Sequence, residues 1–274
     1  MRKIYFYLFS AFLLTGCVNV FKLTDLSSGL EDVTYPNSEL KAKQLLSEMG
    51  KAHGIQYWDS IQTYSVIFKD EFYGFFGKQS HPFKEDNIDF SLNYIPKTSD
   101  GQLEILTGKE KGKLRGIQSG ETYEKKANKD FTVINDKDMK FWIPTYQYFI
   151  EFPNRIQEAT AIKYVGPKVI NGIKTEGVLA SWGTVAPQKD IDQYIVWINA
   201  ETKRIVKIEY TVRDMFKFVA GAAYFKNYKN YNGLILPSEY PVESNLLKEG
   251  FLHKMSIVDF KMNPVSKDYL LPLK

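Results

Sequence analysis

The chain has 274 residues, of which 44% are hydrophobic and 25% are charged, the composition of a globular protein that can bury a sizeable core. Its 36 basic and 32 acidic residues give a formal charge of +4, and the two signs alternate along the chain without forming a basic stripe. This pattern gives no support for nucleic-acid binding. A second domain is not required, because a single sheet of this length is ordinary.

The amino terminus has the layout of an export signal. Arg2 and Lys3 precede an apolar run over residues 4–14, which is too short for a bilayer span of ~20 residues. The run leads into a Leu-Thr-Gly-Cys sequence ending at Cys17, which resembles the lipobox of bacterial lipoproteins. The resemblance implies that residues 1–16 form a signal peptide, that cleavage occurs before Cys17, and that its thiol and new amino group are acylated.

Cysteine usage supports the same interpretation. Cys17 is the only cysteine, so an ordinary secretory signal would leave an unpaired thiol at the cleavage point of an exported protein. Val18 stands where, by the lipoprotein sorting rules, an aspartate would favour retention in the inner membrane. We therefore expect an outer-membrane lipoprotein on the periplasmic face, with surface exposure as the alternative. Residues 17–36 are expected to form a flexible tether, and residues 37–274 a single domain.

The domain is expected to open with an amphipathic helix. Asn37 or Ser38 is the expected cap, and Gly54 the expected end. Apolar side chains recur between them at the i, i+3, i+4, i+7 spacing, so the helix should lay one apolar stripe on a neighbour. These side chains are Ala42, Leu45, Leu46, Met49 and Ala52.

Short alternating segments follow, separated by turns rich in Gly, Asp, Asn and Pro. This spacing is typical of an antiparallel meander, and the many lysines and glutamates indicate one solvated face. The expected strands are 63–69, 88–94, 102–106, 113–117 and 121–125.

The most aromatic stretch of the chain is 141–156. Pro144 removes a backbone donor but suits the first turn of a helix, so we expect a pair of short helices beginning near Ile143. Strands return after this stretch. The Asn171-Gly172 pair is a strong hairpin signal, expected to set Val169 opposite Thr175. The remaining strands are expected within 161–165, 168–182, 219–231, 234–242 and 251–262.

A long hairpin is expected between the strands within 168–182 and 219–231. Residues 194–198 are apolar at every position, which predicts a strand buried on both faces. Residues 204–212 alternate, with Val206 and Ile208 on one face, and a third strand should end at Pro237. We expect the aromatic stretch 141–156 to cover the second face of the buried strand.

The order of these segments resembles that of the LolA-like outer-membrane lipoprotein sorting proteins and their lipoprotein relatives, over residues 39–272. The segments that carry the resemblance are Ala52-His53-Gly54 with Trp58, Tyr194-Ile-Val-Trp-Ile-Asn-Ala-Glu-Thr-Lys203, Tyr228-Lys-Asn-Tyr-Asn-Gly-Leu-Ile-Leu-Pro237 and Ile257-Val-Asp-Phe-Lys-Met-Asn263. The resemblance implies an α+β fold that is mainly antiparallel β: a strongly curved sheet, or unclosed barrel, with helices covering an apolar concave face that can accept acyl chains. The periplasmic carrier of this group is soluble. An anchor at Cys17 makes this chain more similar to the lipoprotein receptor or to the lipid-binding lipoproteins.

Patterns for catalysis and metal binding are missing from the sequence. His53, His81 and His253 lie far apart without ligand spacing, and there is no H-E-x-x-H motif or cysteine pair. His53 is expected at the end of a helix, where its charge would complement the helix dipole. We therefore expect neither an enzyme nor a cofactor.

Two functions remain open from the sequence. The first is a lipoprotein that binds a lipid, an acyl chain or another apolar molecule inside the curved sheet, lined by Trp142, Tyr146, Phe149 and Trp197. Each of these four side chains has packed core as its alternative interpretation. The second function is a structural or interaction lipoprotein with a filled core, whose surface binds a protein or envelope partner that the sequence does not identify.

Overall fold

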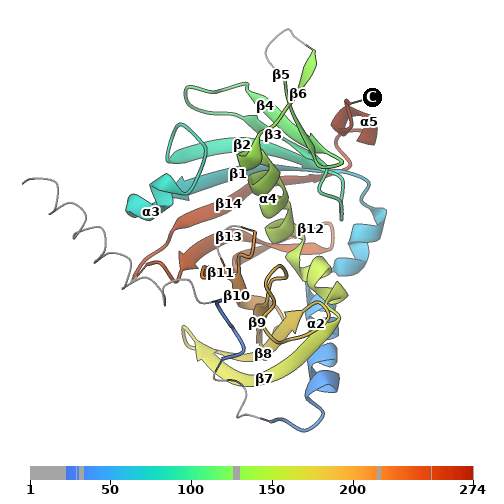
Figure 1. Cartoon of the computed structure of the whole chain (residues 1–274). Coiled ribbons are helices and arrows are strands. Elements are labelled where there is room, and N and C mark those ends of the chain that lie inside the picture. Colours follow the sequence, from blue (N-terminus) through green and yellow to red (C-terminus); the bar gives the residue numbers. More distant parts are fainter. Residues whose placement is uncertain are drawn as a thin grey trace, which may run out of the picture.

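The computed structural model describes residues 23–28, 30, 34–125, 130–214, 217–247 and 249–273. The lipobox, Cys17 and the first part of the expected tether lie outside these residues. The described chain forms one antiparallel sheet of 14 strands, which bends around helix α4 (Figure 1).

The strands are β1 (Tyr64–Phe72), β2 (Asn87–Tyr94), β3 (Gly101–Ile105), β4 (Leu114–Gln118), β5 (Glu121–Lys125), β6 (Phe131–Ile134), β7 (Ala161–Ile170), β8 (Ile173–Ser181), β9 (Tyr194–Asn199), β10 (Ile205–Thr211), β11 (Ala220–Tyr224), β12 (Lys226–Tyr231), β13 (Leu234–Ser244) and β14 (His253–Met262). The α-helices are α2 (Ser38–His53), α3 (Gly74–Gln79), α4 (Lys137–Arg155) and α5 (Lys267–Leu270), and the 3-10 helices are η1 (Ile55–Ser60) and η2 (Ile156–Glu158).

The strand order confirms the expected fold class. It runs β6-β5-β4-β3-β2-β1-β14-β13-β11-β10-β9-β8-β7, with β12 pairing beside β13. The two end strands, β6 and β7, do not pair with each other, so the sheet is not closed into a barrel. Buried and half-buried residues alternate strictly in β1, so one face of this strand is packed on the core and the other is more open.

Helix α2 ends as the sequence predicts but begins differently. Gly54 follows the helix in the left-handed conformation at φ 69°, and its N–H bonds back to the last turn. Asn37 precedes the helix without a side-chain cap bond. The Ser38 hydroxyl instead accepts from the Tyr164 N–H at 3.0 Å and donates to the Tyr164 carbonyl at 3.2 Å, so it joins the helix to β7.

The prediction of two short helices from Ile143 is wrong. The structure has a single 19-residue helix, α4, whose side-chain cap is Asp136, with Pro144 and Pro153 inside it. An internal proline costs a helix about 3 kcal/mol. Eleven residues of α4 are buried, and their packing on the sheet outweighs that cost.

The Asn171-Gly172 turn forms as predicted, with both residues at positive φ. The predicted register is wrong by one residue, because Val169 pairs with Lys174 rather than with Thr175. A two-residue turn places the residues directly before and after it opposite each other, and this fixes every later pair of the hairpin.

Strand β9 is buried on both faces, as expected from its composition. Val196 and Ile198 belong to the main core, which also contains the buried side of α4. Ile195 and Trp197 belong to a second cluster on the opposite face. The aromatic stretch 141–156 therefore covers one face of β9, and other residues cover the second.

The N-terminal segment supplies part of this second cover. Leu26 and Leu30 pack against the second cluster, and the Leu26 N–H donates to Gln193 Oε1 at 3.0 Å. Two residues earlier, the Thr24 N–H donates to the Lys217 carbonyl at 2.9 Å. Part of the stretch expected to act as a tether is thus held on the sheet.

Two further details differ from the expectations for the hairpin. A register shift between Ile205 and Lys207 turns Val206 to the face opposite Ile208. Strand β13 also continues past Pro237, which pairs with Tyr228, and ends at Ser244.

Candidate functional site under helix α4

Helix α4 presses an aromatic row onto the concave face of the sheet. Tyr146 is fully buried, with its ring 5.3 Å from Phe68 and 5.0 Å from Phe90. Trp142 lies one turn earlier, 5.3 Å from Tyr146 and 5.8 Å from Phe72. These separations are those of rings in direct contact. Two of the predicted ligand-binding residues therefore lie together between α4 and the sheet.

Phe149 continues this row toward the other half of the sheet. Its ring lies 5.6 Å from Tyr210 on β10 and 6.3 Å from Tyr240 on β13. Trp142, Tyr146 and Phe149 thus share one core cluster, in which side chains of α4 fill the concave face.

Trp197 does not join the other three predicted residues. It belongs to the second cluster, on the opposite face of β9 from α4. Its indole N–H donates to Glu209 Oε1 at 3.2 Å, and Lys168 Nζ lies 4.8 Å from its ring centre. No single pocket can hold all four predicted side chains, because the sheet separates Trp197 from the rest.

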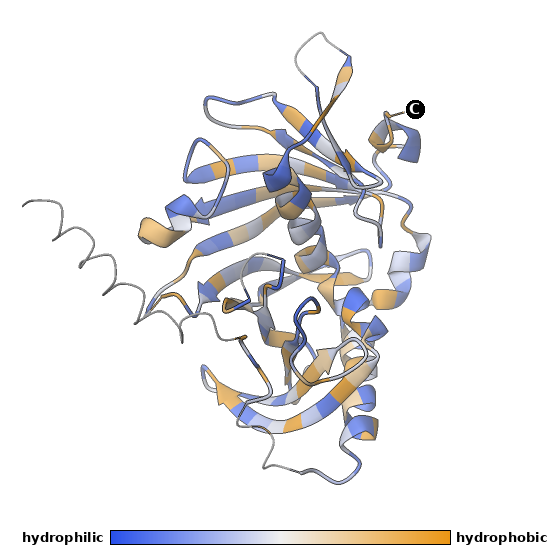
Figure 2. Cartoon of the chain, viewed as in Figure 1, coloured by the Kyte–Doolittle hydropathy of each residue, from blue (hydrophilic) through white to orange (hydrophobic). Residues whose placement is uncertain are grey.

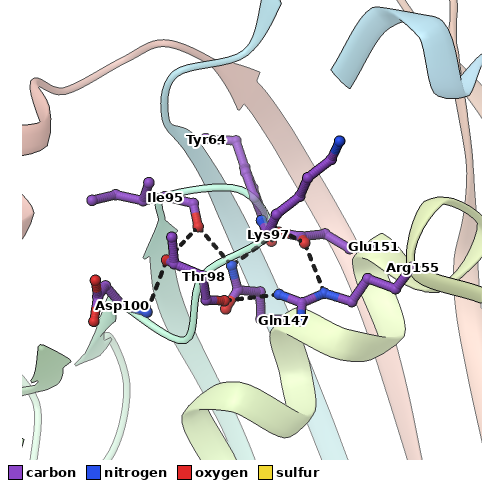
Figure 3. A network of polar contacts seen from close by, with 8 residues as sticks. All are labelled: Tyr64, Ile95, Lys97, Thr98, Asp100, Gln147, Glu151 and Arg155. Atoms are coloured by element: carbon purple, nitrogen blue, oxygen red, sulfur yellow. Dashed lines mark hydrogen bonds and ion pairs between the residues drawn. The ribbon is translucent and has the colours of Figure 1, made fainter. Parts of the chain in front are cut away.

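A buried carboxylate joins the C-terminal half of α4 to the sheet (Figure 3). Glu151 is fully buried and accepts hydrogen bonds from the Tyr64 hydroxyl at 2.8 Å and from the Lys97 N–H, Gln147 Nε2 and Arg155 Nε at 2.9 Å each. Burial and the neighbouring carboxylate raise the pKa of Tyr64 well above its usual value, so its hydroxyl remains a donor. Four donors compensate the carboxylate for its lost hydration.

A second buried carboxylate holds the middle of α4. Asp70 on β1 is fully buried and accepts from the Tyr146 hydroxyl at 2.8 Å. The Nδ1 atom of His253 lies 2.9 Å from the same carboxylate. His53 is not part of this group. Burial, together with Asp70, raises the pKa of Tyr146 and keeps its proton in place as a donor. Asp70 and Glu151 thus fix the helix to the sheet within an aromatic contact, together with the Tyr94 hydroxyl, which donates to the Ile143 carbonyl at 2.7 Å.

These polar residues were missing from the sequence-based site, although a signal existed. Asp70 occupies an inward position of β1, in phase with Val66 and Phe68. His253 is likewise in phase with the buried Met255 of β14. A charged or polar residue at an inward position indicates a buried hydrogen-bond partner. For Asp70 this partner is the Tyr146 hydroxyl of α4, and for His253 it is Asp70.

Metal and membrane-spanning features are absent from the part of the chain that the structure describes. Within it, there is no group of three or more His, Cys, Asp or Glu side chains placed to hold a metal ion. No helix there has the length and apolar character needed to cross a membrane. His81 and His253, distant in sequence, both stack on Phe72, with ring centres 3.8 and 5.1 Å away.

Two hollows open on the outer surface away from α4. One, of about 510 Å³, lies between the turn at Asn232 and the end of β14 near Met262. The other, of about 470 Å³, lies at the start of α2 near Leu40. Neither is lined by a predicted ligand-binding residue.

The comparisons with known proteins identify the fold. No protein-family model and no curated protein matches the sequence. Among solved structures, a domain designated an outer membrane lipoprotein-sorting protein from Vibrio parahaemolyticus is similar at a TM-score of 0.54 and 12% identity, covering 84% of this chain and 96% of that one. A LolA superfamily protein from Nitrosomonas europaea gives 0.50 and 11%, covering 84% and 96%. A DUF1329 family protein from Desulfovibrio piger gives 0.53 and 10%, covering 86% and 98%. The chain therefore has a LolA-like fold.

Proposed function

We propose that the protein is a non-catalytic lipoprotein of the cell envelope, anchored in the outer membrane by acylated Cys17 and facing the periplasm, that binds a lipid or acyl chain between the sheet and α4. One observation carries this proposal: α4 places the aromatic row of Trp142, Tyr146 and Phe149 along the concave face of an unclosed sheet. A helix that covers an apolar face at the open side of a sheet can act as a lid.

The apolar contacts of α4 allow a bound acyl chain to replace part of the helix on the concave face. The rings of α4 now fill the concave face, so an acyl chain must displace part of them. Apolar surface stays out of water when a methylene chain replaces a ring, and the exchange then costs little hydrophobic free energy. The main cost lies in the polar contacts that hold the helix to the sheet, which include those at Asp70, at Glu151 and at the Ile143 carbonyl.

Phe149→Leu and Trp197→Leu form a matched pair that tests the location of the site. Each substitution removes an aromatic ring from a buried cluster at a cost of about 1–2 kcal/mol in stability. Only Phe149→Leu vacates space under α4, and it should tighten binding of a fluorescent fatty acid by about 3- to 10-fold. Trp197→Leu should leave the affinity unchanged. A fluorescence titration of both variants beside the parent protein, with folding checked by circular dichroism, measures this.

Two results would contradict the binding proposal. Equal effects of the two substitutions would place the fatty acid away from α4. If no variant takes up the probe and native mass spectrometry of the purified protein detects no bound lipid, the alternative is favoured. That alternative is an interaction lipoprotein with a filled core, which the close ring contacts of Tyr146 also support.

The anchor has a separate test. Cys17→Ser removes the only thiol in the chain, so metabolic labelling with palmitate should fall to background and the product should remain unprocessed or become soluble. Cell fractionation and gel mobility report both outcomes. Unchanged palmitate labelling in the Cys17→Ser protein would refute the proposed anchor.

A further inference from the structure

Four exposed apolar side chains gather at one end of the sheet, and we refer to them as the apolar tip. Phe75 and Phe76 on α3 are 75% and 49% exposed. Leu246 and Phe251, in the loop between β13 and β14, are 44% and 37% exposed. Large apolar side chains that cluster in the open mark interaction sites, whereas single exposed ones are ordinary.

The two parts of the apolar tip are joined by backbone contacts. The Tyr73 N–H, directly before α3, donates to the Leu252 carbonyl at 2.9 Å. Gly77 packs on the same carbonyl so closely that a Cβ on it would lie 2.2 Å away. Figure 1 shows α3 at the same end of the sheet as the loop between β13 and β14, and Figure 2 shows the apolar character of α3. The tip is thus one surface built on fixed backbone.

The described N-terminal segment meets the sheet beside this surface. Thr24 is bonded to Lys217, in the turn between β10 and β11. The same turn is bonded to the loop of the apolar tip, because Asn245 Nδ2 donates to the Phe218 carbonyl at 2.9 Å and Asn245 Oδ1 accepts from the Ala220 N–H at 3.0 Å. The described residues nearest to Cys17 in the sequence therefore lie next to the apolar tip.

The length of chain before Thr24 limits how the body can face a membrane. Six residues lie between Cys17 and Thr24, so the two are seven residue steps apart, a distance of roughly 25 Å at most in a fully extended chain. The eleven-residue β13 alone is about 36 Å long, and its first residue lies at the end away from the tip. An acyl group on Cys17 therefore keeps the tip near the bilayer and the opposite end of the sheet farther from it.

We infer that the apolar tip docks on the lipid surface that holds the acyl chains of Cys17, with Phe75, Phe76, Leu246 and Phe251 inserted among the headgroups. This inference rests on the proposed anchor. A short tether makes a weak patch sufficient, because the tip stays at a high effective concentration beside the membrane. Docking also fixes which end of the sheet faces the lipid.

Nearby lysines indicate that the contact is apolar rather than electrostatic. Lys78 on α3 pairs with Asp86 at 2.8 Å, and Lys217 pairs with Asp190 at 3.1 Å. These two cations are therefore largely compensated before any anionic lipid approaches. High salt, which screens charge attraction to membranes, should leave the docking in place.

An environment-sensitive dye on a single engineered cysteine tests the inference in the full, lipidated protein. Phe76→Cys places the dye on the apolar tip. Tyr57→Cys is the matched control, since Tyr57 is an aromatic residue 42% exposed whose ring lies against Gly233, at the opposite end of β13. In vesicles of phosphatidylethanolamine and phosphatidylglycerol, the dye at position 76 should shift to the blue and be quenched by acyl-chain-linked quenchers, in low and in high salt. The dye at position 57 should show neither change.

Experiments on the parent protein distinguish failure of the proposed anchor from failure of the docking inference alone. Its only thiol is at Cys17, so thiol labelling of the mature parent would show that the anchor, and with it the proposed function, is wrong. A blocked parent thiol with water-like emission at position 76 would overturn docking alone. A blue shift at position 76 in unlipidated Cys17→Ser protein, in buffer without detergent or vesicles, would also overturn it, since a second copy of the chain would then cover the tip.

Discussion

Replacing Glu151 with alanine is expected to lower the free energy of unfolding by about 3–5 kcal/mol, as when one partner of a buried ion pair is removed. The carboxylate takes four donors at once, from β1, from the loop after β2 and from α4 itself. Without it, the buried Tyr64 hydroxyl and the Lys97 N–H lose their acceptor, and Arg155 loses its counter-ion. Urea or guanidinium denaturation of parent and variant measures the difference.

Two variants control for this result. Glu151→Gln keeps the shape and one acceptor oxygen, so its loss should fall between the parent and Glu151→Ala. Glu201→Ala removes an exposed glutamate in the turn after β9 and should change stability by less than about 0.5 kcal/mol. A loss below about 1 kcal/mol for Glu151→Ala would mean that the carboxylate does not hold α4 to the sheet.

Acidification should destabilise the fold through His53. The histidine is at the end of α2, as predicted, but it is buried, with Nδ1 donating to the Ile235 carbonyl at 3.1 Å and Nε2 accepting from the Ile205 N–H at 3.2 Å. Desolvation lowers the pKa of His53 to about 3 from its usual 6.5, so the predicted charge at the helix end is wrong. A depressed folded-state pKa of a base means that only the unfolded chain takes up the proton between these two values.

The expected slope is a loss of about 1.4 kcal/mol per pH unit as the pH falls below 6.5, continuing until the folded pKa near 3. At pH 7 and above, this contribution is fully present. Glutamine is neutral at every pH, so the free energy of unfolding of His53→Gln does not depend on pH through this position. The difference in that free energy between the parent and His53→Gln should therefore fall by about 1.4 kcal/mol per pH unit on acidification. Denaturation at several pH values between 7 and 4.5 measures both proteins. A constant difference between them would show that His53 titrates alike in the folded and unfolded states.

The fold was predictable because local patterns and global packing agree. Alternation in β1 and β2 gives strands within three residues of their observed bounds, and Gly54 ends α2 as expected. The errors arise where tertiary packing outweighs a local rule. Pro144 argues for a helix start, yet α4 continues through it because its buried side matches the sheet. The bulge at Val206 likewise carries no local signal in a regular alternation.

The site was less predictable than the fold. Trp142, Tyr146 and Phe149 follow helical spacing, so their common location under α4 could be expected once the helix was recognised. Trp197 could not be assigned, because in a strand buried on both faces the parity of a residue does not tell which face meets the lid. Asp70 and Glu151 accept hydrogen bonds from tyrosines far along the chain, Tyr146 and Tyr64, and single-sequence patterns do not pair them.

An unclosed sheet also has a solubility problem, which its two edge strands address differently. Free edges expose unpaired N–H and C=O groups, to which another chain can add in aggregation. At the β7 edge, the Ser38 hydroxyl bonds both the N–H and the carbonyl of Tyr164, and a register shift between Tyr164 and Gly166 makes the strand irregular. The other edge, β6, is only four residues long. The side-chain bond from α2 therefore protects the longer edge, so loosening the start of α2 would expose a surface for intermolecular strand pairing.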